Sequence, residues 1–305
     1  MTSSTSSLTA PASPGAPYSE EILSFPCAGE ILPAVLARPA GPCRGGVLLI
    51  VGGPQYRVGS HRQFLLLSRR LAAEGYAVLR FDYRGMGDAS GDLHNFEQVN
   101  PDIRAALDAF AQACPSLGVG SFQLWGLCDA ASAALMYLHA EADARVGGLV
   151  LLNPWVRSVT SQARAQVKHY YAQKLFDKAF WLKLLRGEVA VFGAVAGFVK
   201  TWLASRRAAP AAGAAGKHTP ALSFQTQMAK GWARGLPKLL ILSGHDLTAR
   251  EFIEYAGTDA AWQGLLARPE VERHDLADAD HTFSNAEARR QVENLTLSWL
   301  QRTVG

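Results

Sequence analysis

Five short apolar runs constrain the fold of this chain more than any other feature of the sequence. Each has only five or six residues and lies next to a glycine or proline, which favours buried parallel strands over helices. The runs are Gly46–Val51, Ala77–Phe81, Ser121–Trp125, Gly148–Leu152 and Lys238–Leu242. The amphipathic helical candidates between and after them are Ser60–Glu74, Pro101–Gln112, Asp129–Ala140 and Ala286–Arg302. This alternation predicts an α/β fold, with a mostly parallel sheet that has helices on both faces.

One long stretch interrupts the alternation. About eighty residues separate Leu152 from Lys238, far more than a simple crossover between parallel strands needs. The part from Arg157 to Lys217 has eleven basic and two acidic residues together with many bulky apolar ones. We therefore expect a helical cap inserted at residues 156–235, before the last two strands. Residues 20–155 and 236–305 then form the core.

Composition excludes several classes of protein. The chain has 305 residues, of which 49% are hydrophobic, and a net charge of +4, without the clustered basic surface of a nucleic-acid binder. The apolar stretch Val189–Val199 is too short to span a bilayer. Residues 1–19 are rich in Ser, Thr, Ala and Pro, lack charged side chains, and have neither the basic start nor the apolar centre of a secretory signal. We expect them to be a disordered leader on a cytoplasmic protein.

The four cysteines are scattered, at Cys27, Cys43, Cys114 and Cys128, and none has the spacing of a metal ligand. Free thiols of this kind suit a reducing compartment. His245 lies beside Asp246, but no cluster of His, Asp or Glu accompanies the pair. We therefore expect no metal and no cofactor.

The strongest local signal is the run WGLCDA, in which Cys128 lies between an expected strand and an expected helix. A G-x-nucleophile-x-G turn at such a junction exposes the nucleophile above the sheet, at the N-terminus of a helix. That position and a nearby histidine favour the reactive thiolate form of a cysteine. Ala130 replaces the usual second glycine, which is a mild departure. The context favours a nucleophile over an inert buried cysteine.

A glycine pair follows the first of the five runs. Consecutive glycines allow backbone N–H groups to face a developing negative oxygen. We expect the N–H groups of Gly53 and Asp129 to form an oxyanion hole, with Gln55 as an alternative donor that contacts substrate. Taken by itself, without the other motifs, the glycine pair would fit an ordinary turn equally well.

Two further residues complete a catalytic set. Asp246 follows the Lys238–Leu242 run, and His281 lies between the last expected strand, Val271–Leu276, and the last helix. The chain order nucleophile, acid, histidine is that of an α/β-hydrolase. His281 would exchange the thiol proton, while Asp246 would orient the imidazole and stabilise its charged form. Asp278 is a reserve candidate for the acid.

The run RFDYRGMGDASG contains a strand end and a glycine-rich turn. We interpret Asp82 and Arg84 as residues that fix this loop by hydrogen bonds, without a chemical role. Gly85 and Gly87 superficially suggest a phosphate loop, but no G-x-G-x-x-G pattern follows, which argues against a dinucleotide-dependent oxidoreductase.

Four motifs together resemble the exosortase A system-associated hydrolases of type 1, a group within the α/β-hydrolase superfamily with a scaffold similar to the serine aminopeptidases. The motifs are GGPQYRVGSHRQF, RFDYRGMGDASGD, WGLCDAASAAL and SGHDLTAREF. The resemblance covers about Glu20 to Arg302 and implies that Cys128, Asp246 and His281 are the triad. It also implies a link to exopolysaccharide production and protein sorting in Gram-negative bacteria. Two departures argue against an ordinary peptidase or lipase. Val51 stands where many related hydrolases have a histidine before the glycines, and the nucleophile is a cysteine, as in dienelactone hydrolases.

The sequence thus predicts a cysteine-dependent acyl hydrolase of the esterase or thioesterase type, acting on a small acyl substrate. An acyltransferase with the same triad, and a non-catalytic binding module on this scaffold, remain alternatives. Phe180, Trp181 and Phe198 of the cap are candidates for lining an acyl pocket. Packing of the cap on the core, with its lysines in solvent, is favoured over contact with an anionic membrane. The oligomeric state stays open.

Overall fold

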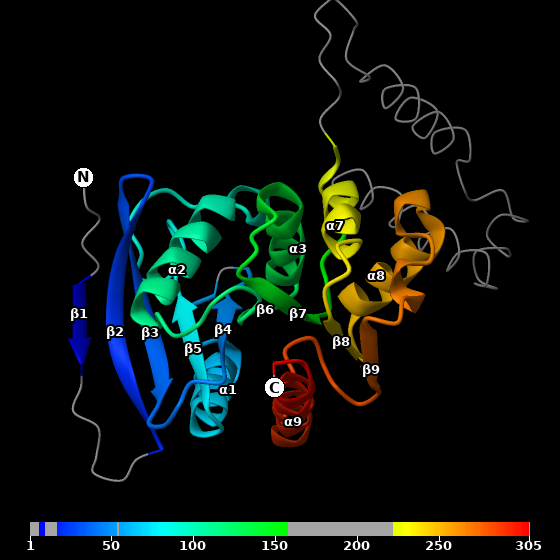
Figure 1. The fold of residues 1–305 in the computed structure, drawn as a ribbon. Helices are drawn as coiled ribbons and strands as arrows, with labels where there is room; N and C mark the ends of the chain where they lie inside the picture. The colour runs from blue at the N-terminus through cyan, green and yellow to red at the C-terminus, as the bar shows by residue number, and fades with distance from the viewer. Residues whose placement is uncertain (1–5, 10–16, 54, 158–221, 305) are drawn as a thin grey trace, which may run out of the picture. The chain divides into compact units, whose positions relative to one another are not determined.

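The computed structural model describes residues 6–9, 17–53, 55–157 and 222–304 of the chain. Its described strands form one 9-stranded sheet in the order β1-β2-β3-β5-β4-β6-β7-β8-β9 (Figure 1). The strands are β1 (Ser6–Thr9), β2 (Tyr18–Cys27), β3 (Glu30–Pro39), β4 (Gly45–Ile50), β5 (Tyr76–Phe81), β6 (Phe122–Leu127), β7 (Val146–Leu152), β8 (Lys238–Ser243) and β9 (Val271–Leu276). The strands from β5 to β9 in that order pair in parallel, whereas β1, β2 and β3 pair antiparallel at one edge.

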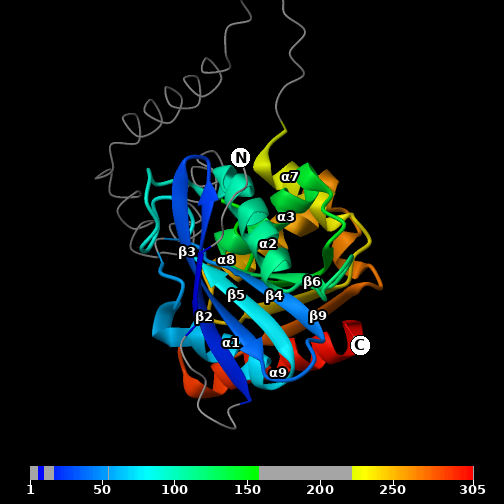
Figure 2. The same cartoon turned by 60° about the vertical axis from the view of Figure 1, so that its left-hand side comes forward.

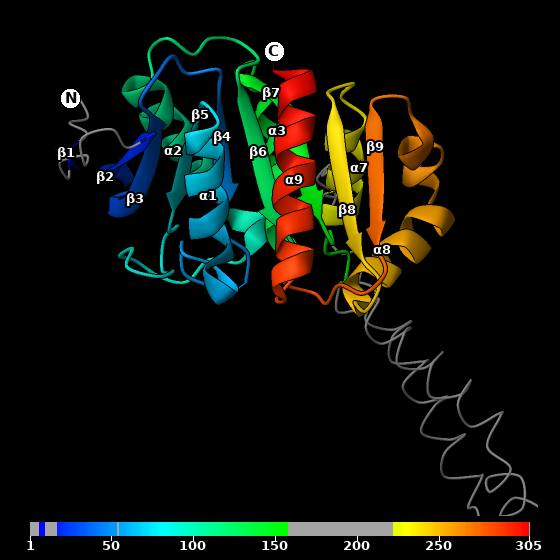
Figure 3. The ribbon, with the colours of Figure 1, turned by 90° about the horizontal axis from the view of Figure 1, so that it is seen from below.

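Helices cover both faces of this sheet. Helices α1 and α9 lie on one face, and α2, α3 and α7 lie on the other (Figures 1 and 3). The α-helices are α1 (Gln63–Ala73), α2 (Asn100–Ala113), α3 (Asp129–Glu141), α7 (Phe224–Trp232), α8 (Leu247–Thr258) and α9 (Ala286–Thr303). Short 3₁₀ helices are η1 (Ser60–Arg62), η2 (Phe96–Gln98), η3 (Ala260–Trp262) and η4 (Leu265–Ala267). Figure 2 shows the sheet from the β2 edge, between its two helical layers.

The five apolar runs and the predicted last strand form β4 to β9, which confirms the predicted α/β fold. Every residue of β4, β5, β6 and β8 is buried, as expected for strands covered on both sides. Strands β2 and β3 were not predicted. Their residues alternate between buried and partly exposed positions, so neither strand has the continuous apolar run that marks the central strands.

The expectation of a disordered leader at residues 1–19 is wrong for part of that segment. Ser6–Thr9 forms β1, which pairs antiparallel with β2, and Tyr18 and Ser19 already belong to β2. An edge strand is held by backbone hydrogen bonds to its neighbour, so a polar composition does not exclude it. The rest of the expected leader, residues 1–5 and 10–16, lies outside the described residues.

The expected cap, residues 156–235, extends too far at its C-terminal end. The chain divides into a core unit, Met1–Val156 with Leu222–Gly305, and a second unit, Arg157–Ala221. Helix α7 belongs to the core: a Cβ atom on Gly231 would lie 1.9 Å from the carbonyl oxygen of Leu135 in α3, so the two backbones touch. Residues 158–221 lie outside the described part of the chain.

No helix within the described residues has the length and apolar character needed to cross a bilayer.

Candidate active site

Cys128 occupies a strained turn between β6 and α3. Its backbone angles are φ 63° and ψ −125°, in a region that residues with a Cβ rarely adopt. Its N–H donates to the carbonyl oxygen of Leu152 at the end of β7 (2.8 Å), which fixes the turn to the neighbouring strand. A Cβ atom on Gly126 would lie 2.6 Å from the backbone of Ala130, so a small residue is required there. This is the geometry predicted for a nucleophile turn.

Asp246 and His281 meet at the same edge of the sheet. Asp246 follows β8 and is 6% exposed, and His281 lies in the loop between β9 and α9. The Nδ1 atom of His281 lies 2.8 Å from Oδ2 of Asp246. With the proton of Nδ1 shared with that carboxylate, Nε2 of the neutral ring is free to accept a proton.

The same carboxylate begins helix α8. It accepts hydrogen bonds from the N–H groups of Thr248 (3.0 Å) and Ala249 (3.3 Å). Burial alone would raise the pKa of Asp246, but the hydrogen bond and charge of His281, together with these two N–H groups, hold the pKa below its ordinary value. Asp246 is therefore a stable anion that can compensate a positive imidazole ring.

Asn153, fully buried at the end of β7, connects the parts of the site. Its Nδ2 donates to Oγ of Ser243 (2.8 Å) and to the carbonyl oxygen of His281 (3.1 Å), and its Oδ1 accepts from the N–H of Ser243 (2.9 Å). Oγ of Ser243 in turn donates to the carbonyl oxygen of Asp280 (2.8 Å). Asn153 was not predicted from the sequence, although an asparagine directly after a buried strand is a usable signal, because asparagine tolerates the positive φ found there.

The predicted oxyanion hole differs from the expectation in one respect. Gly53 and Asp129 lie together, but the N–H of Gly53 donates to both carboxylate oxygens of Asp129, at 2.8 and 3.0 Å. Only the backbone N–H of Asp129 was considered from the sequence. A role for the side chain of Asp129 was not predicted, because its contact with Gly53 joins loops that are 76 residues apart in the sequence.

Gln55 was predicted as an alternative oxyanion donor, but the groups to which it is hydrogen-bonded lie within its own loop. Its backbone N–H donates to the carbonyl oxygen of Gly53 (2.8 Å), and its Oε1 accepts from the N–H of Ser60 (3.3 Å). Because that backbone N–H already has an acceptor, it does not serve as a second oxyanion donor in this arrangement. The three cap residues predicted to line an acyl pocket, Phe180, Trp181 and Phe198, lie outside the described residues.

The prediction that Asp82 and Arg84 fix a loop is confirmed. Asp82, fully buried, accepts from the N–H groups of Arg57 (2.7 Å) and Asp88 (3.1 Å), and its carboxylate also binds the guanidinium of Arg57. Arg84 binds the carboxylate of Asp102 through Nε (3.0 Å) and Nη2 (2.7 Å). The run between β5 and α2 is therefore scaffold.

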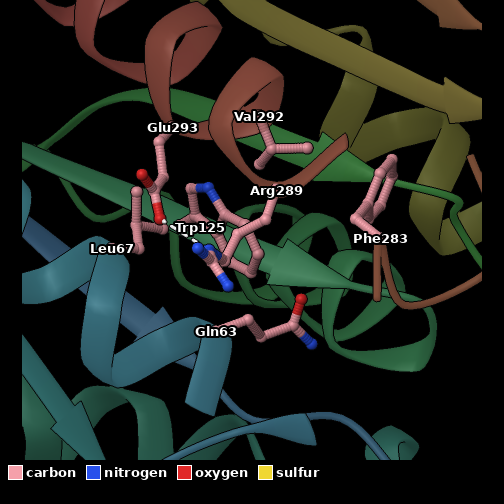
Figure 4. A pocket seen from close by; sticks show the side chains of 7 residues that line it. All are labelled: Gln63, Leu67, Trp125, Phe283, Arg289, Val292 and Glu293. Carbon is pink, nitrogen blue, oxygen red and sulfur yellow. Dashed lines mark ion pairs between the residues drawn. The ribbon is translucent and has the colours of Figure 1, made fainter. Parts of the chain in front are cut away.

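A small cavity lies between α1, β6 and α9, with room for about one water molecule (Figure 4). Its lining residues are Gln63, Leu67, Trp125, Phe283, Arg289, Val292 and Glu293. Nε2 of Gln63 is buried and has no hydrogen-bond partner among the described residues, which suits a bound water, while Nε of Arg289 forms an ion pair with Oε1 of Glu293 (3.5 Å). Cys128 does not line the cavity. Across the described part of the chain, no group of three or more His, Cys, Asp or Glu residues could hold a metal ion.

Comparison with protein families decides the assignment. The model of the family described as "Alpha/beta hydrolase family" matches residues 47–295, which is most of the chain. The chain belongs to the alpha/beta hydrolase family. This confirms the predicted fold, and the prediction of a hydrolase agrees with it. No curated protein matches the sequence.

Solved structures of alpha/beta hydrolases share this fold at low identity. An esterase from Pyrococcus furiosus, Pf2001, has 16% identity and a TM-score of 0.61, with 98% of each chain covered. Est1E from Butyrivibrio proteoclasticus, with ferulic acid bound, has 13% identity and a TM-score of 0.57 over 92% of this chain and 98% of the other. A serine hydrolase homologue from Coxiella burnetii has 13% identity and a TM-score of 0.53, over 91% and 95%. At this identity, the likeness concerns the fold.

Proposed function

We propose that this alpha/beta hydrolase is a cysteine-dependent acyl hydrolase that acts on esters or thioesters. The observation that carries the proposal is the hydrogen bond between His281 and the buried Asp246, at the sheet edge where Cys128 occupies its strained turn. The strained backbone of Cys128 and the lowered pKa of the buried Asp246 beside His281 support these roles. Pf2001, one of the solved structures with this fold, is an esterase by name, which supports an ester as the substrate.

In the first half of the reaction, Sγ of Cys128 attacks the acyl carbon while Nε2 of His281 takes the thiol proton. The negative oxygen that forms is stabilised by backbone N–H groups next to the turn, with Asp129 supplying one of them. His281 then donates its proton to the departing alkoxide or thiolate. The C–O or C–S bond of the substrate breaks, and an acyl thioester on Cys128 remains.

In the second half, His281 removes a proton from water, and the resulting hydroxide attacks the thioester. The C–S bond to Cys128 breaks, the carboxylic acid leaves, and the proton on His281 returns to the thiolate. Asp246 stays ionised throughout and balances the charge on the imidazole. A thiolate suits these activated acyl groups better than amides, because expelling an amine demands stronger acid catalysis.

The sequence resemblance to exosortase-associated hydrolases supports a physiological setting for the proposed activity, because it links the chain to exopolysaccharide production. A small acylated molecule of that system is therefore the proposed substrate.

The proposal is tested with 4-nitrophenyl esters and acyl thioesters of increasing chain length. We expect hydrolysis by the wild type, formation of an acyl adduct on Cys128 visible by mass spectrometry, and loss of both in Cys128→Ala. Cys128→Ser reports whether the site accepts a hydroxyl nucleophile. Undiminished hydrolysis by Cys128→Ala would refute the mechanism, and transfer of the acyl group to an added alcohol in preference to water would favour an acyltransferase.

A further inference from the structure

The carboxylate of Asp129 accepts the hydrogen bond of a backbone N–H group, that of Gly53, which the sequence predicts to stabilise a substrate oxygen. Its two oxygens lie 2.8 and 3.0 Å from the N–H of Gly53, on the loop after β4. Asp129 directly follows the proposed nucleophile and is the first residue of α3. A negatively charged oxygen bound by backbone N–H groups beside the nucleophile resembles the oxyanion of a tetrahedral intermediate.

The neighbouring glycine, Gly52, lies directly against this side chain. A Cβ atom on Gly52 would lie 2.3 Å from Oδ1 of Asp129 and 2.6 Å from the carbonyl oxygen of Leu127, so a larger residue at position 52 would press on both the carboxylate and the backbone at the end of β6. A Cβ atom on Gly53 would meet nothing within 4 Å. Glycine is favoured at position 53 for a different reason, namely its positive φ of +59°. The first glycine therefore makes room both for the backbone of the nucleophile turn and for the carboxylate of Asp129.

We infer that Asp129 is an internal occupant of the oxyanion hole, which restrains acylation of Cys128 until the carboxylate is displaced. The carbonyl oxygen of a substrate cannot accept a hydrogen bond from the N–H of Gly53 while that N–H donates to the carboxylate of Asp129. The restraint acts on acyl transfer and leaves reactions of the thiol that need no oxyanion hole untouched. Because Cys128 must be the nucleophile for this restraint to act, the role of Asp129 depends on the proposed function.

The charges around Asp129 indicate how the carboxylate is released. Burial raises the pKa of Asp129, against the N–H groups of Gly53, Ala130 and Asp129 itself and the charge of His281, which lower it. Tyr83 is a further titratable neighbour: burial raises its pKa, and the charge of Asp129 contributes to that rise. Since the pKa of Asp129 lies above its ordinary value, acidification neutralises the carboxylate and weakens its hold on the N–H groups.

The test compares two reactions of one thiol. Iodoacetamide alkylates Cys128 without an oxyanion hole, whereas acylation by 4-nitrophenyl butyrate requires one. Both rates are proportional to the fraction of Cys128 that is thiolate, so the ratio of the acylation rate to the alkylation rate does not depend on that fraction. The ratio is measured on the full chain for the wild type, Asp129→Asn and Asp129→Ala, with thermal unfolding as a check of folding. The control is Asp92→Asn, which removes one exposed negative charge from the loop between β5 and α2.

We expect the ratio to rise at least about tenfold in Asp129→Ala, to rise less in the isosteric Asp129→Asn, and to stay within about threefold of the wild type in Asp92→Asn. In the wild type it should increase as the pH falls, and in Asp129→Asn it should be flat. A ratio that is unchanged or lower in both Asp129 variants overturns the inference. If Cys128 is neither acylated nor alkylated faster than Cys43 in any variant, the proposed function fails as well.

Discussion

The carboxylate of Asp246 both orients His281 and begins helix α8, with its Oδ2 atom 2.8 Å from Nδ1 of the histidine and its oxygens bound to two backbone N–H groups. One side chain thus supports both the chemistry and the local fold. Asparagine keeps the helix-capping ability of aspartate but lacks its charge. A substitution can therefore separate the two roles.

We predict that Asp246→Asn lowers kcat/KM for ester hydrolysis by about 10²- to 10⁴-fold, because the histidine loses its partner charge and its preferred tautomer. Its unfolding temperature should stay close to that of the wild type, whereas Asp246→Ala should lose activity and about 1 kcal/mol of stability. Hydrolysis assays and thermal unfolding of both variants check this. Hydrolysis by Asp246→Asn at nearly the wild-type rate would remove Asp246 from the triad.

Asp143 gives a prediction for the dependence of stability on pH. It accepts hydrogen bonds from Oη of Tyr137 (2.6 Å) and from N (3.0 Å) and Nε (2.9 Å) of Arg145. Burial raises the pKa of Asp143, but these bonds and the charge of Arg145 outweigh it and lower the pKa to about 2. The stabilisation is therefore complete above the ordinary aspartate value near 4 and is lost as the pH falls towards 2.

We expect Asp143→Asn to reduce the free energy of unfolding by about 1–2 kcal/mol at neutral pH, and the difference from the wild type to shrink between about pH 4 and pH 2. The matched control is Asp108→Asn, since Asp108 pairs with the same arginine but its side chain is 53% exposed. Urea unfolding at several pH values measures both. Equal effects of the two substitutions would contradict this account.

Gly231 allows α7 to approach α3. A Cβ atom there would lie 1.9 Å from the carbonyl oxygen of Leu135, a backbone atom that cannot rotate away. We predict that Gly231→Ala destabilises the fold by about 2–4 kcal/mol. Gly257→Ala in α8 is the control: a Cβ atom on Gly257 meets nothing within 4 Å, so this change should be neutral or stabilising by up to about 1 kcal/mol. If Gly231→Ala were as stable as Gly257→Ala, α7 would not pack on α3 as described.

The central strands and the order of the site residues could be predicted because each depends on local pattern. Continuous apolar runs mark strands covered on both faces, and the strand-to-helix turn at Cys128 has a small-residue signature. The position of Asp246 and His281 after their strands follows from the topology of a parallel sheet. These predictions needed no knowledge of distant contacts.

The features that were missed depend on contacts between distant segments. Helix α7 follows a long basic insertion and was assigned to it, since nothing local shows that Gly231 meets the backbone of α3. The contact between Gly53 and the carboxylate of Asp129, and the hydrogen bonds of Asn153, arise only when separate loops converge at one sheet edge. Strand β1 pairs with β2 through its backbone, and side-chain composition is a weak indicator of such pairing.

The most direct test of the central claim, that Cys128 is an activated nucleophile, is competitive iodoacetamide labelling of the native protein near pH 6, resolved for each cysteine by mass spectrometry. Burial raises the pKa of Cys27 and of Cys114 to about 11, so both should react slowly, and Cys43, partly exposed like Cys128, is the matched control. We predict that Cys128 reacts at least about tenfold faster than Cys43 and that His281→Ala abolishes the difference. Labelling of Cys128 at the rate of Cys43 would contradict the proposed triad.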